Sequence, residues 1–244
     1  MGSKLRVACY NQDSKDPKII FSKTEKIQAD LILFPEGFFE KNAIDDALWL
    51  KKSLQLKMVF VLGYSSENYI TQKIFLPTNK ILKYHKIHLG TVEKQNYLSG
   101  DEILTFEYAN FKIGVMICSD THFNELFIIQ RKLGTELILA PFRSPHNKVK
   151  RKKLWDKFLP TRAYDYRLSI VANNYYSEGL EGSVAYNPYG DEIKSNKESF
   201  LPMYVIEKFE SKGGMGTIDF FKKRREEVYV KIFKSISKVG NVLL

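Results

Sequence analysis

The sequence contains few cysteines and no long apolar run. Two of its 244 residues are cysteines, Cys9 and Cys118, too few for a disulfide framework, which indicates a reduced, cytoplasmic protein. No apolar run approaches the ~20 residues that span a bilayer, and the stretch MGSKLRVACY lacks the apolar segment of a signal peptide. Linker-like stretches rich in glycine, proline or serine, low-complexity tracts and repeats are also absent. We therefore expect one domain over residues 1–244, outside the membrane.

The chain is basic. The formal net charge is +10 at pH 7, and the densest basic run is HNKVKRKK at 146–153. A basic protein can bind nucleic acid or anionic substrates. This run carries no interleaved aromatic residues, and the chain shows no nucleic-acid-binding motif, so a solvated, lysine-rich surface is the simpler interpretation.

Short apolar runs alternate with helix-like segments. The runs are near-continuous, which is typical of buried strands, and they occupy residues 5–10, 30–35, 57–64, 73–77, 111–118, 136–141, 168–176 and 202–209. Helices are predicted at 18–29, 44–56, 123–134 and 148–167. The third should place Phe123, Leu126, Phe127 and Leu133 on one face and end at Gly134, and Pro160 should break or kink the fourth. The pattern predicts an α/β layered domain, with a less regular segment from Gly213 on.

Cys118 lies where an apolar run ends and a helix is predicted to follow. Ligands of α/β proteins bind at the carboxyl ends of strands. A helix N-terminus offers free N–H groups and a positive dipole end, which lower a thiol pKa and can hold an oxyanion. Cys118 is therefore a candidate nucleophile, although a buried core cysteine fits the same position. Cys9 has apolar neighbours within a strand and is predicted to belong to the core.

Two further polar residues follow apolar runs. Glu36 in LILFPEGFF stands between a proline and a glycine that favour a tight turn. An apolar environment there would raise the pKa of its carboxylate and suit it as a general base. Lys86 in ILKYHKIHLG would offer a positive charge to a developing oxyanion. Taken alone, Glu36 fits an exposed loop equally well, whereas Lys86 fits a solvated surface better than a catalytic site. The usual base for a nucleophilic cysteine is histidine, and the candidates are His85, His88, His122 and His146.

A series of motifs in matching order resembles the nitrilase superfamily of carbon–nitrogen hydrolases. FPEGFF is similar to its glutamate segment, KYHKIHLG to its lysine segment and GVMICSDTHFNE to its nucleophile segment. The resemblance extends over residues 5–230 through LSGDE, WDKFLPTRAYDYRLSIVANN, GSVAYNPYGDEI and FFKKRREEVY. Each motif is weak to moderate by itself, whereas the ordered set is strong.

The resemblance implies a catalytic triad of Glu36, Lys86 and Cys118. It also implies a second glutamate seven residues before the glycine of SGD, which is Glu93, and which would orient the substrate or the attacking water. Glu36 would take the thiol proton, Cys118 would attack the carbonyl, and Lys86 with the main-chain N–H of Ser119 would stabilise the oxyanion. Ammonia would leave, and water would release the acid from a thioester. No metal and no organic cofactor is required.

The resemblance also implies the architecture and assembly. The fold would be a four-layer αββα sandwich, and dimers or larger homo-oligomers would form through helices at 123–133 and 150–167. The segment after residue 213 would cross to a partner subunit.

The sequence leaves the substrate open. The default expectation is a small linear amide or carbamoyl compound, with nitriles as an alternative. A sharper hypothesis is an amide that also carries a carboxylate, held by Arg143, because this arginine follows the apolar run 136–141 and guanidinium pairs well with carboxylate. A surface arginine or a subunit ion pair fits the same position. The chain departs from the family pattern near the expected pocket, at His122 in place of arginine, at Asn124 in place of proline, and in the short, basic APFRSPHNKVKRKK.

Two other classes of function remain open. One is a non-catalytic member that binds nucleic acid or a protein partner, which the basic run suggests and the complete Glu–Lys–Cys set opposes. The other is an acyltransferase, or an ammonia-producing subunit that serves a separate synthetase.

Overall fold

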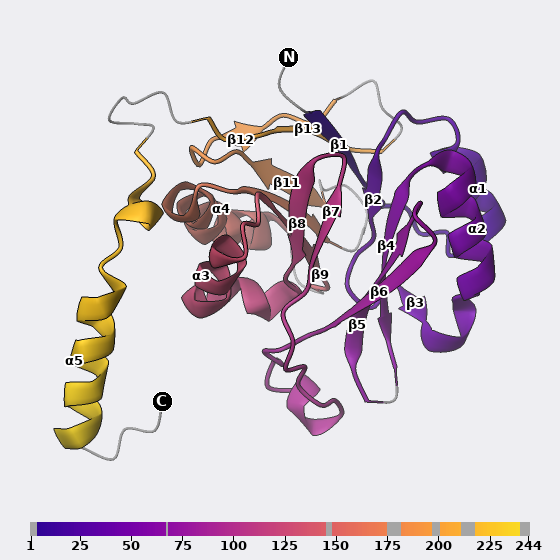
Figure 1. Ribbon diagram of the computed structural model, residues 1–244. Coiled ribbons are helices and arrows are strands. Elements are labelled where there is room, and N and C mark those ends of the chain that lie inside the picture. Colours follow the sequence, from indigo (N-terminus) through magenta and orange to yellow (C-terminus); the bar gives the residue numbers. More distant parts are fainter. Residues whose placement is uncertain are drawn as a thin grey trace.

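Two β-sheets stack face to face, with helices on both outer faces (Figure 1). This arrangement is seen in a computed structural model that describes residues 4–66, 68–144, 148–174, 182–196, 201–210 and 218–239. The expected four-layer αββα sandwich is therefore confirmed.

The first sheet has the strand order β13–β1–β2–β4–β5–β6, and β3 pairs with β4. Strands β1, β2 and β4 are parallel, whereas β13, β5 and β6 run antiparallel to their neighbours. The strands are β1 (Lys4–Cys9), β2 (Leu31–Leu33), β3 (Phe39–Glu40), β4 (Val59–Ser65), β5 (Ile70–Leu76), β6 (Lys80–His85) and β13 (Met203–Glu207).

The second sheet has the strand order β12–β11–β10–β9–β8–β7. Its central strands β8, β9 and β10 are parallel, so their carboxyl ends meet at one edge. The strands are β7 (Thr105–Tyr108), β8 (Phe111–Val115), β9 (Leu137–Phe142), β10 (Ser169–Asn174), β11 (Ser183–Tyr186) and β12 (Glu192–Ile193).

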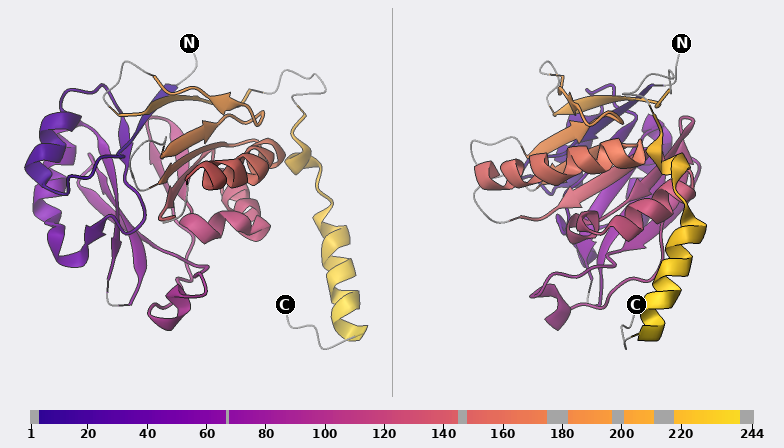
Figure 2. Two further views of the ribbon diagram at one scale, coloured as in Figure 1. Left: turned by 180° about the vertical axis from the view of Figure 1, so that it is seen from behind. Right: turned by 90° about the vertical axis from the view of Figure 1, so that its left-hand side faces the viewer.

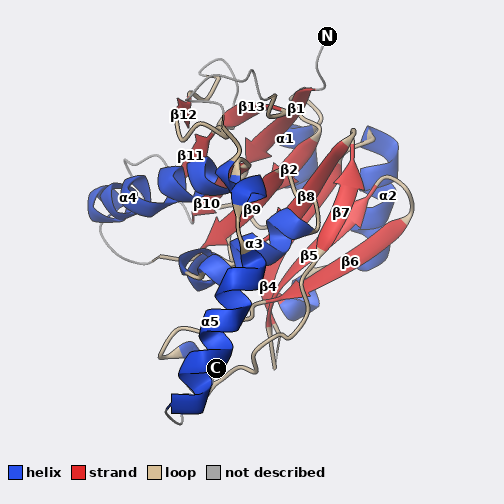
Figure 3. Cartoon of the chain, turned by 60° about the vertical axis from the view of Figure 1, so that its left-hand side comes forward, coloured by secondary structure: helices blue, strands red, loops and turns tan. Residues whose placement is uncertain are grey.

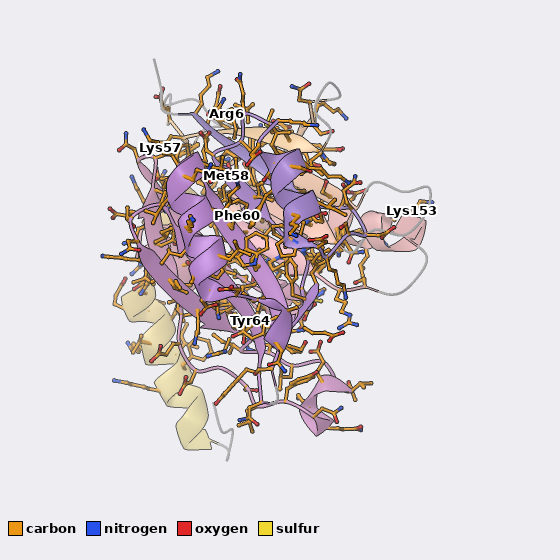
Figure 4. The ribbon with its side chains drawn as sticks, turned by 90° about the vertical axis from the view of Figure 1, so that its right-hand side faces the viewer. Arg6, Lys57, Met58, Phe60, Tyr64 and Lys153 are labelled. Atoms are coloured by element: carbon orange, nitrogen blue, oxygen red, sulfur yellow. The ribbon has the colours of Figure 1, made fainter. Side chains whose placement is uncertain are left out.

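Helices cover the outer face of each sheet (Figure 3). Helices α1 (Pro17–Thr24) and α2 (Asp46–Leu56) cover the first sheet, and α3 (Asn124–Lys132) and α4 (Lys148–Tyr166) cover the second. Figure 4 looks onto the first of these faces, where Met58, Phe60 and Tyr64 lie at β4 and join an apolar cluster with Trp49 of α2.

Alternate residues of a central strand enter different cores. Val7 and Leu33 face the core between the sheets, whereas Ala8 and Ile32 face the helices, because successive side chains of a strand point to opposite faces. Burial on both faces explains why these strands read as near-continuous apolar runs. Each such aliphatic side chain contributes about 1.5–3 kcal/mol when it is fully buried. Cys9 lies in the core between the sheets, as predicted.

Helix α4 does not break at Pro160, one of the two predicted effects, because it continues through this residue to Tyr166. An internal proline costs about 3 kcal/mol. The helix buries Trp155, Leu159 and Ala163 against the second sheet, and this packing stabilises it across the missing hydrogen bond.

Helix α3 confirms part of the predicted apolar face. Leu126 and Phe127 are buried, but Phe123 and Leu133 are 39% and 42% exposed. Gly134 follows the helix in the left-handed region, at φ +85°, as expected of a residue that ends a helix.

The segment from Gly213 on is more regular than predicted. Residues 211–217 lie outside the described part, but α5 (Glu226–Val239) is a helix that stands off from the two sheets (Figure 2). Its side chains Tyr229, Val230, Ile232 and Phe233 are 41–53% exposed. In the described residues, none of the helices combines the length and apolar character needed to cross a membrane.

Candidate active site

Polar residues from both sheets meet at the carboxyl ends of strands. Glu36 follows β2 and Lys86 follows β6 in the first sheet, whereas Cys118 follows β8 and Arg143 follows β9 in the second. Because the parallel strands of each sheet end at the same edge, a side chain after each one can face the same space. The site is therefore shared between the two sheets.

A tight turn places Glu36 in the interior, where its side chain is 2% exposed. Gly37 completes the turn at φ +58°, a region that glycine adopts without steric cost. Gly63 of β4 lies directly under the turn, and a Cβ on Gly63 would come within 2.0 Å of the Pro35 carbonyl oxygen. Only glycine therefore allows β4 to approach the turn this closely.

Lys86 lies between two carboxylates. Its Nζ donates to Glu36 Oε1 at 2.7 Å and to both oxygens of Glu93 at 2.8 Å, and its side chain is 1% exposed. Glu93 belongs to the 3₁₀ helix Glu93–Gln95 and also accepts a hydrogen bond from the main-chain N–H of Gly90 at 2.6 Å. Gly100, the glycine of SGD, donates its N–H to the Lys86 carbonyl at 2.8 Å. The loop over residues 86–100 thus holds Lys86 against Glu36.

Cys118 sits in a strained turn at the start of the 3₁₀ helix Cys118–His122. Its φ is +47°, a left-handed conformation that costs a non-glycine residue about 1–3 kcal/mol. Two hydrogen bonds close the turn around it: Ile117 N–H donates to Asp120 Oδ2 at 3.0 Å, and Asp120 N–H donates to the Ile117 carbonyl at 3.0 Å. The turn directs the partly exposed thiol toward the charges of Glu36, Lys86 and Glu93.

Burial opposes the ionisation of both acids of the cluster, Glu36 and Cys118. Burial raises the pKa of Glu36, while Lys86 lowers it and Glu93 raises it, which agrees with the predicted shift. Burial raises the pKa of the Cys118 thiol to about 12, Glu36 adds to this rise, and Lys86 opposes it. The expectation that a helix N-terminus would lower this thiol pKa is wrong, because burial and the two neighbouring carboxylates outweigh it. Burial lowers the pKa of Lys86, but Glu36, Cys118 and Glu93 together raise it above its ordinary value.

The charge of Glu36 acts on the Cys118 thiol, which makes the two groups a candidate pair for proton transfer. The raised pKa of Cys118 favours its neutral thiol, and the ammonium of Lys86 favours the carboxylate form of Glu36 against the effect of burial. Glu36 Oε2 is buried and has no hydrogen-bond partner among the described residues. This oxygen is free to accept a proton, so the arrangement combines a base, a fixed ammonium and a soft nucleophile.

Ser119 and Arg143 lie beside the cluster. Ser119 Oγ donates to the His88 carbonyl, which ties the cysteine turn to the loop after Lys86. The main-chain N–H of Arg143 helps to lower the pKa of both Glu36 and Cys118. Its guanidinium reaches over Gly37, with Nη1 at 3.0 Å from the position of a Cβ on that glycine.

The described histidines interact with other groups. His85 Nδ1 lies 2.9 Å from Thr71 Oγ1, the ring of His88 stacks on Phe123 at 3.5 Å, and His122 contacts the ring of Phe158. His146 lies outside the described residues, together with its neighbours Pro145 and Asn147. Glu36 is therefore the base candidate that the geometry favours.

Two functional positions were missed in the sequence. Asp120 is fully buried and holds the cysteine turn, and its signal was the aspartate two residues after Cys118 in the nucleophile segment. Asn173 at the end of β10 donates to the carbonyls of Tyr10 and Leu33 at 3.1 and 2.7 Å, which joins the two sheets near Glu36. Within the described ranges, no group of three or more His, Cys, Asp and Glu residues is arranged to hold a metal ion.

Comparisons with known proteins identify the family of the chain. The carbon-nitrogen hydrolase family model matches residues 18–199. The chain is 25% identical to the omega-amidase NIT2 of Homo sapiens over 219 residues, which cover 80% of this chain and 78% of that protein. It is 23% identical to an (R)-stereoselective amidase of Pseudomonas sp over 70% of this chain, and 28% identical to nitrilase homolog 2 of Dictyostelium discoideum over 59% of this chain. These last two matches span 65% and 52% of the relatives' own lengths, which is less than two thirds.

Solved structures show the same fold. The amidase of Nesterenkonia sp. AN1 in complex with butyramide superposes with a TM-score of 0.71 at 18% identity, over 94% of this chain and 97% of that chain. A variant of the same amidase in complex with acrylamide gives a TM-score of 0.72 at 18% identity, with the same coverage. Since the family model covers most of the chain, the chain belongs to the carbon-nitrogen hydrolase family, and the relatives that it matches include amidases and a homolog of nitrilases.

Proposed function

We propose that the protein hydrolyses the carbon–nitrogen bond of a small linear amide or carbamoyl compound through a thioester on Cys118. The observation that supports this proposal is the position of Lys86 between Glu36 and Glu93 beside the cysteine. The family membership and the amidase relatives support the reaction class. We further propose that the chain acts as one domain in the cytoplasm.

The first half of the reaction forms the thioester. Glu36 takes the proton of the Cys118 thiol as Sγ bonds to the carbonyl carbon, and the carbonyl electron pair moves to oxygen. Lys86 and the main-chain N–H of Ser119, at the start of a 3₁₀ helix where N–H groups lack acceptors, stabilise this oxyanion. Glu36 then returns the proton to nitrogen, the carbon–nitrogen bond breaks, and ammonia leaves.

The second half releases the acid. Glu36 takes a proton from water as the water oxygen attacks the thioester carbon, and Glu93 orients the water or the substrate. The carbon–sulfur bond breaks, the acid leaves, and Cys118 regains a proton. These steps use water and groups of this chain alone.

The decisive test is ammonia release from a panel of small amides, carbamoyl compounds and nitriles, with intact mass spectrometry of the protein. We expect an acyl adduct on the wild type and no turnover by Cys118→Ala or Cys118→Ser. Turnover that survives in Cys118→Ala would contradict the proposal. Preferential turnover of nitriles would support the nitrilase alternative.

We propose that Arg143 selects amides that carry a carboxylate. Its side chain is exposed at the site edge over Gly37, and in the described part of the chain its guanidinium forms no ion pair. A charged hydrogen bond is worth about 1.5–3 kcal/mol, so Arg143→Ala should raise KM for a dicarboxylic monoamide about 10–100-fold. Arg143→Lys should recover part of the loss. Equal effects of Arg143→Ala on a neutral amide and on the carboxylate-bearing one would refute this assignment.

We also propose a homodimer that buries the outer faces of α3, α4 and α5. Ile129 of α3 and Leu133 directly after it are 41% and 42% exposed, and the apolar face of α5 lies nearby. Together α3 and α5 line a cleft of about 690 Å³ that includes Ile128, Tyr229 and Phe233. Monomeric proteins rarely expose large contiguous apolar surface, which supports a partner subunit on this side of the molecule.

A non-catalytic, nucleic-acid-binding role is the second candidate, on the ground of the +10 net charge. It predicts binding to DNA or RNA whose affinity falls steeply with salt. The charged cluster around Cys118 has no use in such a role, so the hydrolase is the function that the geometry supports best.

A further inference from the structure

One buried carboxylate connects the segments that carry Lys86 and Cys118. Asp120 is 0% exposed, lies two residues after the nucleophile candidate and is not part of the proposed reaction. A fully buried carboxylate is costly unless each oxygen finds donors. The donors that satisfy this one come from three separate parts of the chain.

The two oxygens of Asp120 together reach all three parts, with Oδ1 on His88 and Oδ2 on Tyr84 and Ile117. Oδ1 accepts the main-chain N–H of His88 at 2.7 Å and lies 3.2 Å from the His88 ring Nδ1. Oδ2 accepts the hydroxyl of Tyr84 at 2.8 Å and the main-chain N–H of Ile117 at 3.0 Å. Tyr84 and His88 lie on either side of Lys86 in the sequence, and Ile117 precedes Cys118.

The connection crosses from one sheet to the other. Tyr84 belongs to β6 of the first sheet, whereas Ile117 follows β8 of the second. Among the described residues, the Lys86 segment also meets the cysteine turn through the hydrogen bond from Ser119 Oγ to the His88 carbonyl, the stacking of His88 on Phe123, and apolar packing around Ile87 and Cys118. Asp120 is the contact that holds the main chain on both sides.

We propose that Asp120 is a positioning residue, which fixes the distance between the Lys86 ammonium and the Cys118 thiol by binding the Tyr84 hydroxyl and the main-chain N–H groups of His88 and Ile117. The inference rests on the proposed function, because it assigns Asp120 to the same reaction. Asp120 touches neither substrate nor reacting atoms. It acts by holding Cys118 in its left-handed turn and Lys86 within reach of the developing oxyanion.

Replacement of one carboxylate oxygen tests this role. In Asp120→Asn, an amide NH₂ replaces one of the two carboxylate oxygens. This NH₂ cannot accept the hydrogen bonds that the oxygen accepted, so the donors on that side lose their acceptor while the side-chain volume is kept. Tyr84→Phe removes a single donor and keeps both main-chain bonds. Asp30→Asn is the matched control, because Asp30 also accepts main-chain and side-chain hydrogen bonds, from Arg6, at the opposite end of β2 from Glu36.

The readouts are kcat and KM for the best amide, and the rate of alkylation of each cysteine by iodoacetamide. A misplacement of about 1 Å can cost ~10²-fold in rate, so we expect kcat of Asp120→Asn to fall by that factor while KM changes less than about 3-fold. Alkylation of Cys118 should slow about 10-fold, and Tyr84→Phe should lie between Asp120→Asn and the wild type. Cys9, which is 0% exposed, reports global loosening and should stay unmodified.

The outcomes separate the possible failures. A kcat of Asp120→Asn equal to that of Asp30→Asn would overturn the proposal, and so would losses that fall on KM alone. If Cys9 of Asp120→Asn is alkylated, the variant has unfolded and Tyr84→Phe decides: unchanged kcat overturns the proposal, and a lowered kcat with Cys9 protected supports it. If the wild type releases no ammonia in a Cys118-dependent way, the proposed function fails, and the alkylation rates of Cys118 in the same variants still decide the positioning role.

Discussion

Glu36 is a carboxylate in surroundings that disfavour its charge. It is buried, one of its oxygens has no hydrogen-bond partner in the described part of the chain, and Glu93 lies nearby. A group whose pKa is raised by folding weakens the fold at every pH at which it is ionised. The same property makes it a stronger base than an ordinary glutamate at neutral pH.

We therefore predict that Glu36→Gln abolishes turnover and raises the melting temperature at pH 8. Below the ordinary glutamate pKa of 4.5, Glu36 is protonated in the folded and unfolded states alike and contributes nothing. As the pH rises through the raised pKa of the folded protein, the wild type loses stability that the glutamine variant keeps. Thermal unfolding at pH 4 and pH 8 should show a gain of at least about 2 °C, present at pH 8 alone. A variant that melts below the wild type at pH 8 would contradict this assignment of charge.

The pH profile of the wild type follows from the same shift. In the proposed reaction the ionised form of Glu36 is the base, so kcat/KM should fall on the acid side through a pKa above 4.5. Glu93 raises the pKa of Glu36, so Glu93→Gln should move this acid limb to lower pH, whatever its effect on the maximal rate. Ammonia release measured between pH 4 and pH 9 checks both statements. An acid limb that moves upward in Glu93→Gln would argue against coupling between the two carboxylates.

At the scale of the element, β4 and the Glu36 turn depend on one glycine. A Cβ at Gly63 would lie 2.0 Å from the Pro35 carbonyl oxygen, so Gly63→Ala must push the turn away from β4. We predict a loss of about 1–3 kcal/mol in the free energy of unfolding, together with a large fall in kcat. The matched control is Gly134→Ala after α3, where φ is +85° but the nearest atom lies at 3.7 Å. This control should lower stability by about 1 kcal/mol and leave kcat unchanged, as denaturant unfolding and ammonia assays would show.

The elements that were predicted are those with a local signal. Buried strands such as β4 and β9 read as apolar runs, and α2 and α3 read as amphipathic segments, because both faces or one face of each is buried. The short strands β3 and β12 and the polar strand β7 carry no such signal and were missed. The exposure of Leu133 and the continuity of α4 through Pro160 depend on packing against other elements, which periodicity does not report.

The candidate site likewise has features that the sequence predicts and features that it does not. The positions of Glu36, Lys86 and Cys118 after strands could be predicted from the sequence, and the resemblance supplied their order. The raised pKa of Cys118 could not be predicted, because it arises from carboxylates that are distant in the sequence. The role of Asp120 was hidden for the same reason, since its donors Tyr84 and His88 lie 36 and 32 residues away.

At the scale of the whole molecule, α5 leaves the body with an apolar face exposed (Figure 1). If this face packs on a second copy, a charge within it should separate the subunits. We predict that Phe233→Asp, at a side chain 53% exposed, converts a dimer to a monomer. Leu48→Asp on α2, at a side chain 40% exposed over the other sheet, is the control and should leave the dimer intact. Size-exclusion chromatography with light scattering checks the masses, and a monomeric wild type would refute the proposed assembly.

The division of the site between two sheets makes alignment of the layers a condition of activity. Glu36 and Lys86 move with the first sheet and Cys118 with the second, and Asp120 and Asn173 are hydrogen-bonded links across the gap. A slip of one layer over the other would leave every strand and helix intact and still separate the proposed base Glu36 from the proposed nucleophile Cys118. On warming, turnover should therefore stop several degrees below the temperature at which circular dichroism detects loss of secondary structure. The two sheets would lose their relative alignment first, and the fold would be lost only at a higher temperature.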